Sequence, residues 1–251
     1  MNWGILAVAA GVGSLVVAGL SYAAGKVHVN GHVPRYAEHW GHRPDEHPAD
    51  VLHYVALGDS AAQGVGASSV EKGYVSLIGA RLARETGRPV SITNLSVSGA
   101  VSDDVVSEQL GQLDSLPFTP DIITIAIGGN DVVYPRHNTE SFAASLTTIL
   151  ERLPTGSFVG DVPWFTIPGF NVVSGQMATR ARQLITDHGH HLVEIHRASR
   201  SLGYWKYYLN VAQDLFHPND VGYAKWADLF WEQIVESGTL ERLRADQLQP
   251  A

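Results

Sequence analysis

Residues 121–131 read DIITIAIGGND, an unbroken run of β-branched and small apolar residues that ends in two glycines. A run of this kind, without polar alternation, is typical of a strand in a parallel sheet whose two faces are both covered by helices. Neighbouring parallel strands need a crossover connection, which is usually a helix. We therefore expect strands and helices to alternate along the chain.

The expected alternation is present on both sides of this run. Further strands are predicted at 51–57, at 90–97, within 156–165 and at 191–196, and helices at 71–86, 102–116, 139–153, 174–188 and 219–237. This order predicts right-handed βαβ units in a three-layer α/β/α fold with a mainly parallel, flavodoxin-like sheet. The domain is expected to span residues 48–245, followed by a short tail over 246–251.

The composition excludes several classes of function. The chain has 251 residues, of which 45% are hydrophobic, so it can build one substantial core. Its formal net charge of −8 argues against nucleic acid as a partner, because such binding relies on clustered Lys and Arg. The absence of cysteine excludes disulfides, thiolate nucleophiles and Cys-type zinc sites.

The N-terminal segment differs from the rest of the chain. Trp3–Gly25 carries no charged residue, and about 20 apolar residues suffice for a helix that crosses a bilayer. The glycines of this stretch disfavour a soluble helix, whereas membrane spans tolerate them. We expect one N-terminal hydrophobic helix, with residues 1–26 acting as a signal peptide or a transmembrane anchor. The membrane is then a partner through this segment.

The location of the main domain stays open at this point. Export to the extracytoplasmic face is favoured, either as a membrane-anchored or as a secreted protein. Lys26, Arg35 and Arg43 follow the apolar run, however, and the positive-inside rule argues against an outside location for the residues after it.

Residues 27–47 are predicted to form a flexible linker. The stretch 27–50 has three prolines and no sustained periodicity. It also holds five irregularly spaced histidines, which favour a solvated tether over a metal site. No metal or cofactor is expected.

Four polar or glycine-rich elements are expected at one edge of the sheet. They are Gly58–Ser60, Ser98–Ala100, Gly128–Asp131 and Asp214–Pro218, and the first three each follow a predicted strand. Ligands of open α/β sheets bind outside the carboxyl ends of the strands. Each fragment alone has an ordinary alternative as a turn or a helix cap, but together they indicate a site.

The residue types at this edge suit acyl transfer. A serine nucleophile needs a base, a group that orients the base and donors for the oxyanion. Ser60 is the candidate nucleophile, His217 the base and Asp214 its partner. The N–H groups of Ser60 and Gly99 and the side-chain amide of Asn130 are candidate oxyanion donors.

These blocks resemble those of the SGNH hydrolase superfamily, the GDSL-type esterases and lipases. Gly58–Ser60 matches the first block, Gly99 the second, Gly129–Asp131 the third, and Asp214 with His217 the last. The resemblance spans about residues 51–234. It implies an SGNH-type sheet, a Ser-His-Asp triad and ester hydrolysis through an acyl-enzyme, with no cofactor.

The departures from the family pattern concern the neighbours of the catalytic candidates. Ala61 stands where the GDSL name has leucine, which leaves the mechanism intact. The bulky Phe216 directly precedes His217 and is expected to narrow an acyl pocket. Trp164, Phe165 and Tyr134 are candidates for lining that pocket, with core or loop packing as the alternative.

Three functions remain open from the sequence. The first is a membrane-anchored or exported serine esterase or lipase that acts on small-molecule or lipid esters. The second is an O-acetyl esterase that acts on cell-envelope glycans. The third is a non-catalytic binding module on a tether. The acyl chain, the alcohol part of the substrate and the oligomeric state are not determined by these patterns.

Overall fold

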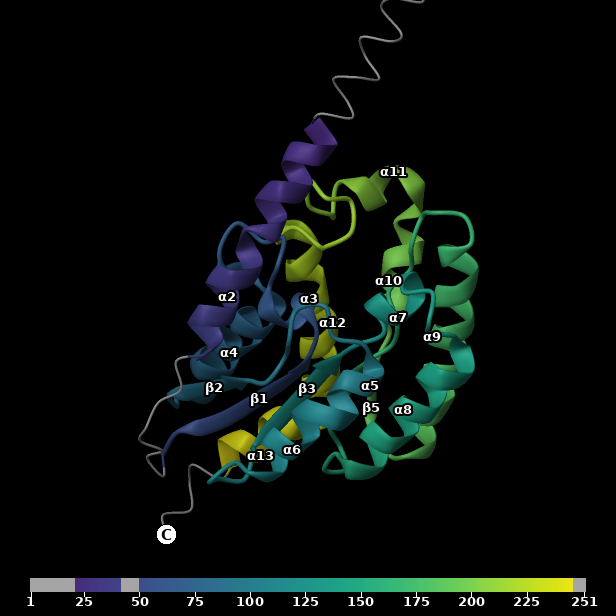
Figure 1. Cartoon of the computed structure of the whole chain (residues 1–251). Helices are drawn as coiled ribbons and strands as arrows, with labels where there is room; N and C mark the ends of the chain where they lie inside the picture. The colour runs from purple at the N-terminus through teal and green to yellow at the C-terminus, as the bar shows by residue number, and fades with distance from the viewer. Residues whose placement is uncertain (1–20, 42–49, 246–251) are drawn as a thin grey trace, which may run out of the picture.

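The computed structural model describes residues 21–41 and 50–245. A five-stranded parallel sheet in the order β2-β1-β3-β4-β5 lies between two layers of helices (Figure 1). The strands are β1 (Leu52–Gly58), β2 (Val90–Asn94), β3 (Ile122–Ala126), β4 (Phe158–Gly160) and β5 (His191–Val193). The three-layer α/β/α fold with a parallel sheet is thus confirmed.

Each face of the sheet has its own hydrophobic core. Successive side chains of a strand point to opposite faces. In β1, Val55 and Leu57 therefore pack in one cluster, and Tyr54 and Ala56 pack in the other. All five residues of β3 are buried, as expected for a strand that is covered on both faces.

Helices of each layer supply the partners of these side chains. The first cluster is covered by α5 (Ser102–Asp104), a π-helical turn (Val105–Gln109), α6 (Leu110–Asp114), α8 (Thr139–Arg152) and α9 (Phe170–Asp187). The second is covered by α4 (Tyr74–Thr86), α12 (Asp220–Glu236) and α13 (Thr239–Ala245). A 3-10 turn, η1 (Val70–Lys72), precedes α4.

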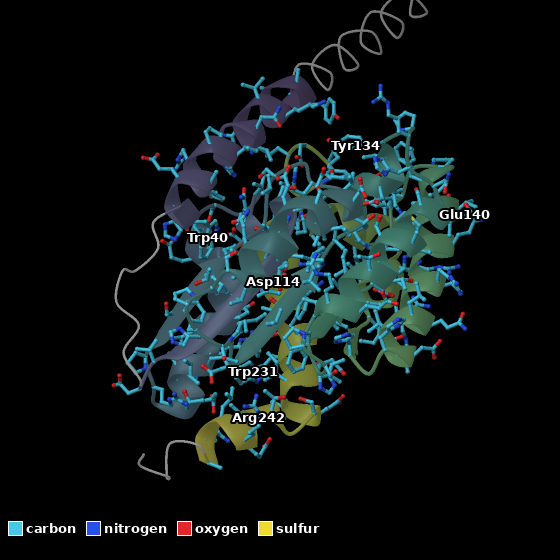
Figure 2. All side chains as sticks on the ribbon, turned by 60° about the horizontal axis from the view of Figure 1, so that its bottom comes forward. Trp40, Asp114, Tyr134, Glu140, Trp231 and Arg242 are labelled. Carbon is cyan, nitrogen blue, oxygen red and sulfur yellow. The ribbon has the colours of Figure 1, made fainter. Side chains whose placement is uncertain are left out.

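Four shorter helices follow strands at the carboxyl edge of the sheet. They are α3 (Ser60–Gln63), α7 (Gly129–Val133), α10 (Ile195–Ser201) and α11 (Gly203–Tyr208). Tyr134, at the end of α7, and Arg242, in α13, lie at opposite ends of the molecule (Figure 2). The carboxyl edge is therefore far from α13.

The prediction of a flexible linker is wrong for residues 27–41. Residues 21–30 are helical and, after a turn at Gly31, α2 (His32–Gly41) continues along the domain. Val29 and Tyr36 are buried against Val65, Val70 and Ala212. The apolar residues 29, 33, 36 and 40 recur at helical spacing, a signal that the prolines and histidines of this stretch obscured.

The predicted N-terminal hydrophobic helix lies largely outside the described residues, which begin at Ser21. Residues 42–49 and the predicted tail 246–251 also lie outside them. Within 21–41 and 50–245, none of the helices combines the length and the apolar character that a membrane crossing requires.

Candidate active site

Ser60 is the first residue of α3, just after strand β1, which lies next to the central strand β3. The chain turns there because Gly58 has φ of +133° and lies against β3, where an added Cβ would be 2.2 Å from Ala126 O. Asp59 caps the helix, since its Oδ1 accepts a hydrogen bond from the N–H of Ala61 at 2.9 Å. Only 5% of Ser60 is exposed.

The turn that carries Ser60 is anchored from the core by Gln109. No sequence motif indicates this role for Gln109. Its Oε1 accepts from the N–H of Gly58 at 2.9 Å, and its Nε2 donates to the carbonyl of Gly58 at 2.8 Å. Gln109 belongs to the π-helical turn and is fully buried. Both backbone groups of Gly58 are thereby held in place.

Asp214 and His217 lie on the loop that precedes α12. His217 Nδ1 is 2.5 Å from Asp214 Oδ2, and His217 Nε2 is 2.9 Å from Ser60 Oγ. Asp214 Oδ1 also accepts from the backbone N–H groups of Phe216 and His217, each at 3.1 Å. The structure thus brings the three predicted catalytic residues into one relay.

The electrostatics of this loop favour a charged Asp214. Burial acts to raise the pKa of the Asp214 carboxyl. The hydrogen bond and the charge of His217, together with the two backbone N–H groups, outweigh burial and hold this pKa below its usual value. A carboxylate that stays ionised can orient the imidazole and stabilise it when it is protonated.

The three predicted oxyanion donors lie on the neighbouring turns. Gly99 follows β2 with φ of +87°, and the N–H groups of Gly99 and Ser60 have no acceptor among the described residues. Asn130, in α7, donates from Nδ2 to Ala100 O at 2.9 Å, and the same atom lies 3.5 Å from Asp59 Oδ2. The amide of Asn130, in the third block, is therefore held between Asp59 of the first block and Ala100 of the second.

Two buried carboxylates lie beside the relay. Burial raises the pKa of Asp59 to about 6, against the opposing effects of the Ala61 N–H and of His217. Burial also raises the pKa of Asp131, although this carboxyl accepts hydrogen bonds from the N–H and the hydroxyl of Ser102. The Asp131–Ser102 contact ties α7 to the start of α5.

A largely apolar pocket opens beside Ser60, between α10 and α12. Phe165 and Phe216 stack on its wall with ring centroids 5.5 Å apart. Its other lining residues include Trp164, Ser199, Leu202, Tyr207, Val211, Lys225, Trp226 and Leu229. Three of the four predicted pocket residues, Trp164, Phe165 and Phe216, thus share one pocket with Ser60 and His217.

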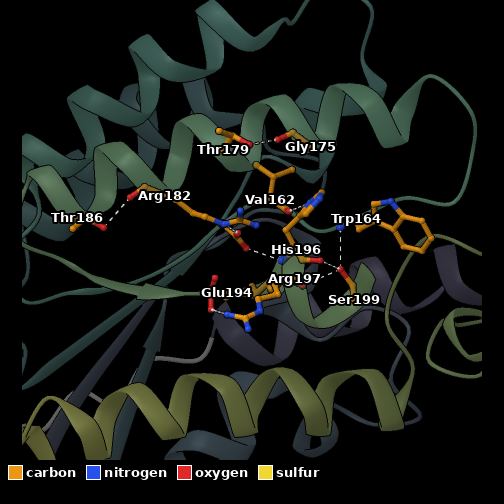
Figure 3. A network of polar contacts seen from close by, with 12 residues as sticks. Val162, Trp164, Gly175, Thr179, Arg182, Thr186, Glu194, His196, Arg197 and Ser199 are labelled. Carbon is orange, nitrogen blue, oxygen red and sulfur yellow. Dashed lines mark hydrogen bonds and ion pairs between the residues drawn. The ribbon is translucent and has the colours of Figure 1, made fainter. Parts of the chain in front are cut away.

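A polar network holds the wall of this pocket (Figure 3). Ser199 Oγ accepts from the N–H of Trp164 at 3.0 Å. Asp161 accepts from the backbone N–H of His196 at 2.7 Å and from Arg182 Nε at 2.9 Å. Burial raises the pKa of Asp161 to about 6 in spite of the Arg182 charge. No local sequence signal marks these residues, because they meet only in the fold.

The fourth predicted pocket residue takes a different position. The Tyr134 hydroxyl lies 3.9 Å from where a Cβ on Gly99 would be, on the donor side of Ser60 and outside the lining of the apolar pocket. The space that a side chain on Gly99 would occupy is therefore open and is bordered by Tyr134.

Comparison with known families decides what kind of protein carries this site. The model of the GDSL-like lipase/acylhydrolase family matches residues 56–225, which hold the nucleophile turn, both donor turns and the Asp–His loop. The chain belongs to this family. It is accordingly a member of the SGNH hydrolase superfamily, and its class is that of the carboxylic ester hydrolases.

Two curated relatives match part of the GDSL-like domain. The chain is 34% identical to Lipase 1 of Streptomyces coelicolor over 131 residues, which are 49% of the chain and 45% of that relative. It is 37% identical to a GDSL-like esterase of Mycobacterium tuberculosis over 90 residues, which are 35% of the chain and 27% of that relative. The chain thus spans less than half the length of each relative.

Solved structures share the fold of the GDSL-like domain. An α/β hydrolase enzyme from the metagenome of Lake Arreo is 25% identical, with a TM-score of 0.59 over 75% of this chain and 96% of that one. The acetylxylan esterase Axe2 of Geobacillus stearothermophilus is 19% identical, with a TM-score of 0.59 over 73% of this chain and 94% of that one. The latter likeness concerns the fold alone.

The described histidines outside the relay lie apart from one another or in structural contacts. Among the described residues, no group of three or more His, Asp or Glu side chains is placed to hold a metal ion. His32, from α2, instead lies close to the site, where its Nδ1 accepts from the N–H of Gly66 at 3.3 Å. Burial, followed by nearby cationic groups, lowers the pKa of His32, so it is a neutral acceptor.

Proposed function

We propose that the protein hydrolyses carboxylic esters through a Ser60–His217–Asp214 triad and an acyl-enzyme. The observation that carries the proposal is the continuous relay, with 2.9 Å from Ser60 Oγ to His217 Nε2 and 2.5 Å from His217 Nδ1 to Asp214 Oδ2. Both distances suit transfer of the hydroxyl proton to the imidazole.

In the proposed reaction, Ser60 Oγ attacks the ester carbonyl carbon while its proton moves to His217 Nε2. The charge that develops on the carbonyl oxygen is stabilised by the N–H groups of Ser60 and Gly99 and by the amide of Asn130. The carbon–oxygen bond to the alcohol then breaks, and the alcohol leaves with the proton from His217. A water molecule cleaves the acyl-enzyme by the same route and restores the Ser60 hydroxyl.

The pocket supports an acyl ester or lipid ester as the substrate. The stacked rings of Phe165 and Phe216, together with Trp164, present an apolar wall next to Ser60. Such a wall stabilises an acyl chain by removing its methylene groups from water, at about 0.8 kcal/mol per buried CH₂. An acetyl group on a glycan has no chain to fill this space.

We also propose that residues 1–26 anchor the protein in a membrane or direct its export. The support is the uncharged stretch Trp3–Gly25. Two measurements distinguish an anchor from a cleaved signal. They are extraction of cell membranes at alkaline pH and mass spectrometry of the N-terminal peptide. An anchored chain stays in the membrane fraction with its first residues intact, whereas a cleaved signal leaves a shortened, released chain.

The catalytic proposal is tested with the full chain in detergent. Hydrolysis of p-nitrophenyl esters from acetyl to dodecanoyl is measured for the wild type and for Ser60→Ala, together with covalent labelling by a fluorophosphonate. We expect labelling and turnover in the wild type only, with turnover rising beyond the acetyl ester. If the folded wild type is not labelled by the fluorophosphonate and hydrolyses no ester faster than Ser60→Ala, the result contradicts catalysis and favours a binding module.

The chain-length profile distinguishes the second candidate substrate. A preference for the acetyl ester, with turnover of acetylated glycans, would assign the protein to the O-acetyl esterases instead. Because the apolar pocket adjoins Ser60, Phe165→Ala should reduce kcat/KM for long esters and leave the acetyl ester nearly unchanged.

A further inference from the structure

Exposed apolar side chains gather at the end of the molecule that carries the catalytic relay. In the part of the chain that the structure describes, every exposed large hydrophobic residue except Val235 lies on the N-terminal helix or on a segment beyond the carboxyl end of a strand. These segments are the loops after β2 and β4, the end of α7, the first turns of α9 and α12, the Asp–His loop, and α11 with Leu209. A soluble surface seldom concentrates apolar groups in this way.

The most exposed of these side chains belong to α11 and the residue after it. Trp205 is 91% exposed and Leu209 is 70% exposed. They are four residues apart, so they lie on the same side of the helical turn. Their neighbours hold α11 to the domain, because Tyr204 packs edge-on against Trp164 and the Tyr208 hydroxyl lies 3.1 Å from Thr166 Oγ1.

The same segment forms part of the pocket wall. Tyr207 and Val211 line the pocket and pack with Trp164 in one small cluster. Trp205 and Leu209 therefore project outward from the element whose other side faces the substrate space.

The charges around this surface are positive in a chain of net charge −8. From Ile195 to Gln213 there are three cations, Arg197, Arg200 and Lys206, and no Asp or Glu. Among the described residues, Arg197 is the one of these three that pairs with a carboxylate, that of Glu194. Tryptophan, tyrosine and basic residues together are typical of segments that lie at the interface of a bilayer with anionic lipids.

The N-terminal helix reaches the same end of the molecule. Helix 21–30 and α11 lie close to this end in Figure 1. Gly25 packs directly on Gln213, where an added Cβ would be 2.5 Å from Gln213 Cβ. Gly25, the last residue of the uncharged stretch, thus contacts the residue that directly precedes Asp214.

We propose that α11 and Leu209 form a contact surface for an anionic lipid bilayer. Trp205 and Leu209 insert at the level of the headgroups, and Arg200 and Lys206 face the lipid phosphates. The pocket mouth is then turned toward the membrane, so that an ester substrate moves into it from the lipid phase. The substrate part of this inference rests on the proposed function, whereas the membrane contact itself does not.

The contact is tested by fluorescence on the full chain, which has no native cysteine. Single variants Trp205→Cys and Leu209→Cys carry a polarity-sensitive dye, and Val235→Cys is the matched control, because it is the exposed apolar residue away from the relay. The protein is reconstituted in phosphatidylcholine vesicles with and without phosphatidylglycerol. We expect blue-shifted emission and protection from aqueous iodide at 205 and 209 only, and more strongly with the anionic lipid.

Two results would overturn the proposal. One is iodide access at 205 and 209 equal to that at 235. The other is protection that appears in detergent without vesicles and grows with protein concentration, which would make the surface an interface between copies of this chain.

A second measurement connects the surface to turnover. The double variant Trp205→Glu/Leu209→Glu is compared with Val235→Glu on a water-soluble ester and on an ester embedded in the anionic vesicles. We expect an unchanged rate on the soluble ester and a rate about tenfold lower on the embedded ester, because two carboxylates replace apolar contacts at a negative surface. Equal rates of the wild type and the double variant on the embedded ester would contradict a role in substrate supply.

The outcomes separate this inference from the proposed function. A wild type that hydrolyses neither ester contradicts the esterase proposal, while the dye measurement still decides the contact. If the wild type hydrolyses both esters while the dye on Trp205→Cys stays exposed to water, the esterase proposal is retained and the contact surface is rejected.

Discussion

The two halves of the catalytic relay are held in different ways. Ser60 sits on a turn between Gly58 and Gly64 that follows β1, an inner strand of the sheet, and residues 58–63 of this turn are buried. His217 and Asp214 sit on a peripheral loop that closes on itself through a few backbone contacts, such as the Ala212 N–H to His217 O bond at 2.7 Å. The first half is therefore part of the core, and the second is attached to it.

The peripheral loop depends on neighbours from distant parts of the chain. Gly66 packs against it so closely that an added Cβ would lie 2.4 Å from Pro218 O and 2.8 Å from His217 Cβ. The N–H of Gly66 in turn donates to His32 of the N-terminal helix. Leu215 has φ of +59°, the one positive value at a non-glycine residue in the described part of the chain. Changes in the turn should thus affect stability, and changes in the loop should mainly affect catalysis.

The largest effect is expected from Asp214→Asn. The amide keeps the shape of the side chain but does not stabilise a protonated His217, so kcat should fall by about 10⁴-fold, while the melting temperature stays close to that of the wild type. The measurement is steady-state hydrolysis of a soluble ester together with thermal unfolding. Asp220→Asn, a surface carboxylate paired with Lys72, is the control. A loss below tenfold would mean that His217 is oriented by another group.

The opposite behaviour is expected from Gln109→Leu in the core half. The variant leaves the buried N–H of Gly58 without its acceptor, so the free energy of unfolding should fall by about 2–3 kcal/mol. Urea unfolding measures this change, with Gln233→Leu as the control, because the half-buried Gln233 side chain bonds to the side chain of Glu236 and, among the described residues, to no backbone group of the core. Stability within about 0.5 kcal/mol of the wild type would refute the anchoring role of Gln109.

A pH-dependent effect is expected from Asp59→Asn. Burial raises the pKa of Asp59 from 3.8 to about 6 in the folded protein. The folded state therefore bears the cost of a buried charge above pH 6, and this cost disappears as the pH falls from about 6 to about 4. The variant, whose amide oxygen can still cap Ala61, should be more stable than the wild type by up to about 3 kcal/mol at pH 8.

The acid end of the pH range serves as the control for the Asp59→Asn prediction. Unfolding of both proteins is followed between pH 4 and pH 8, and the stability difference should approach zero at the acid end. A difference that is constant across this range would show that the charge of Asp59 is not its cause.

The smallest effect is expected from the support of the loop by the N-terminal helix. His32→Ala removes the acceptor for the Gly66 N–H, so kcat should fall about three- to tenfold, with little change in KM. His32→Asn offers a carbonyl oxygen near the position of Nδ1 and should recover most of the loss. If the alanine and asparagine variants behave alike, this hydrogen bond does not position the loop.

Long, strongly patterned segments were predictable from the sequence, and contacts that exist only in the fold were not. The buried runs of β1 and β3 and the turns after them revealed the sheet and the places of Ser60 and Asn130, and the Asp214–Pro218 element before the last helix revealed that of His217. Gln109 and Asp161 carry no local signal, because a buried polar side chain is recognised only by its partners. The position of Tyr134 shortly after Asn130 in the sequence predicts that it lines the pocket. In the structure the end of α7 instead turns Tyr134 toward Gly99.

The N-terminal helix shows how one signal can hide another. Its apolar positions at 29, 33, 36 and 40 follow a helical period. Gly31, Pro34 and the interspersed histidines are typical of a linker, and they predict one here in spite of the helical period. Tyr36 is buried and donates a hydrogen bond to Ala67 O. These tertiary contacts stabilise the helix, and intrinsic helix propensity does not include them.

The contact between Ser60 and His217 spans 157 residues of the chain. During synthesis the serine leaves the ribosome first and its base follows roughly ten to thirty seconds later, at ordinary elongation rates. Until α12 docks, the nascent chain carries a hydroxyl that has no base and is chemically inert. Under the proposed mechanism, completion of the fold gives Ser60 its base, and a truncated product that ends before residue 217 should not hydrolyse esters.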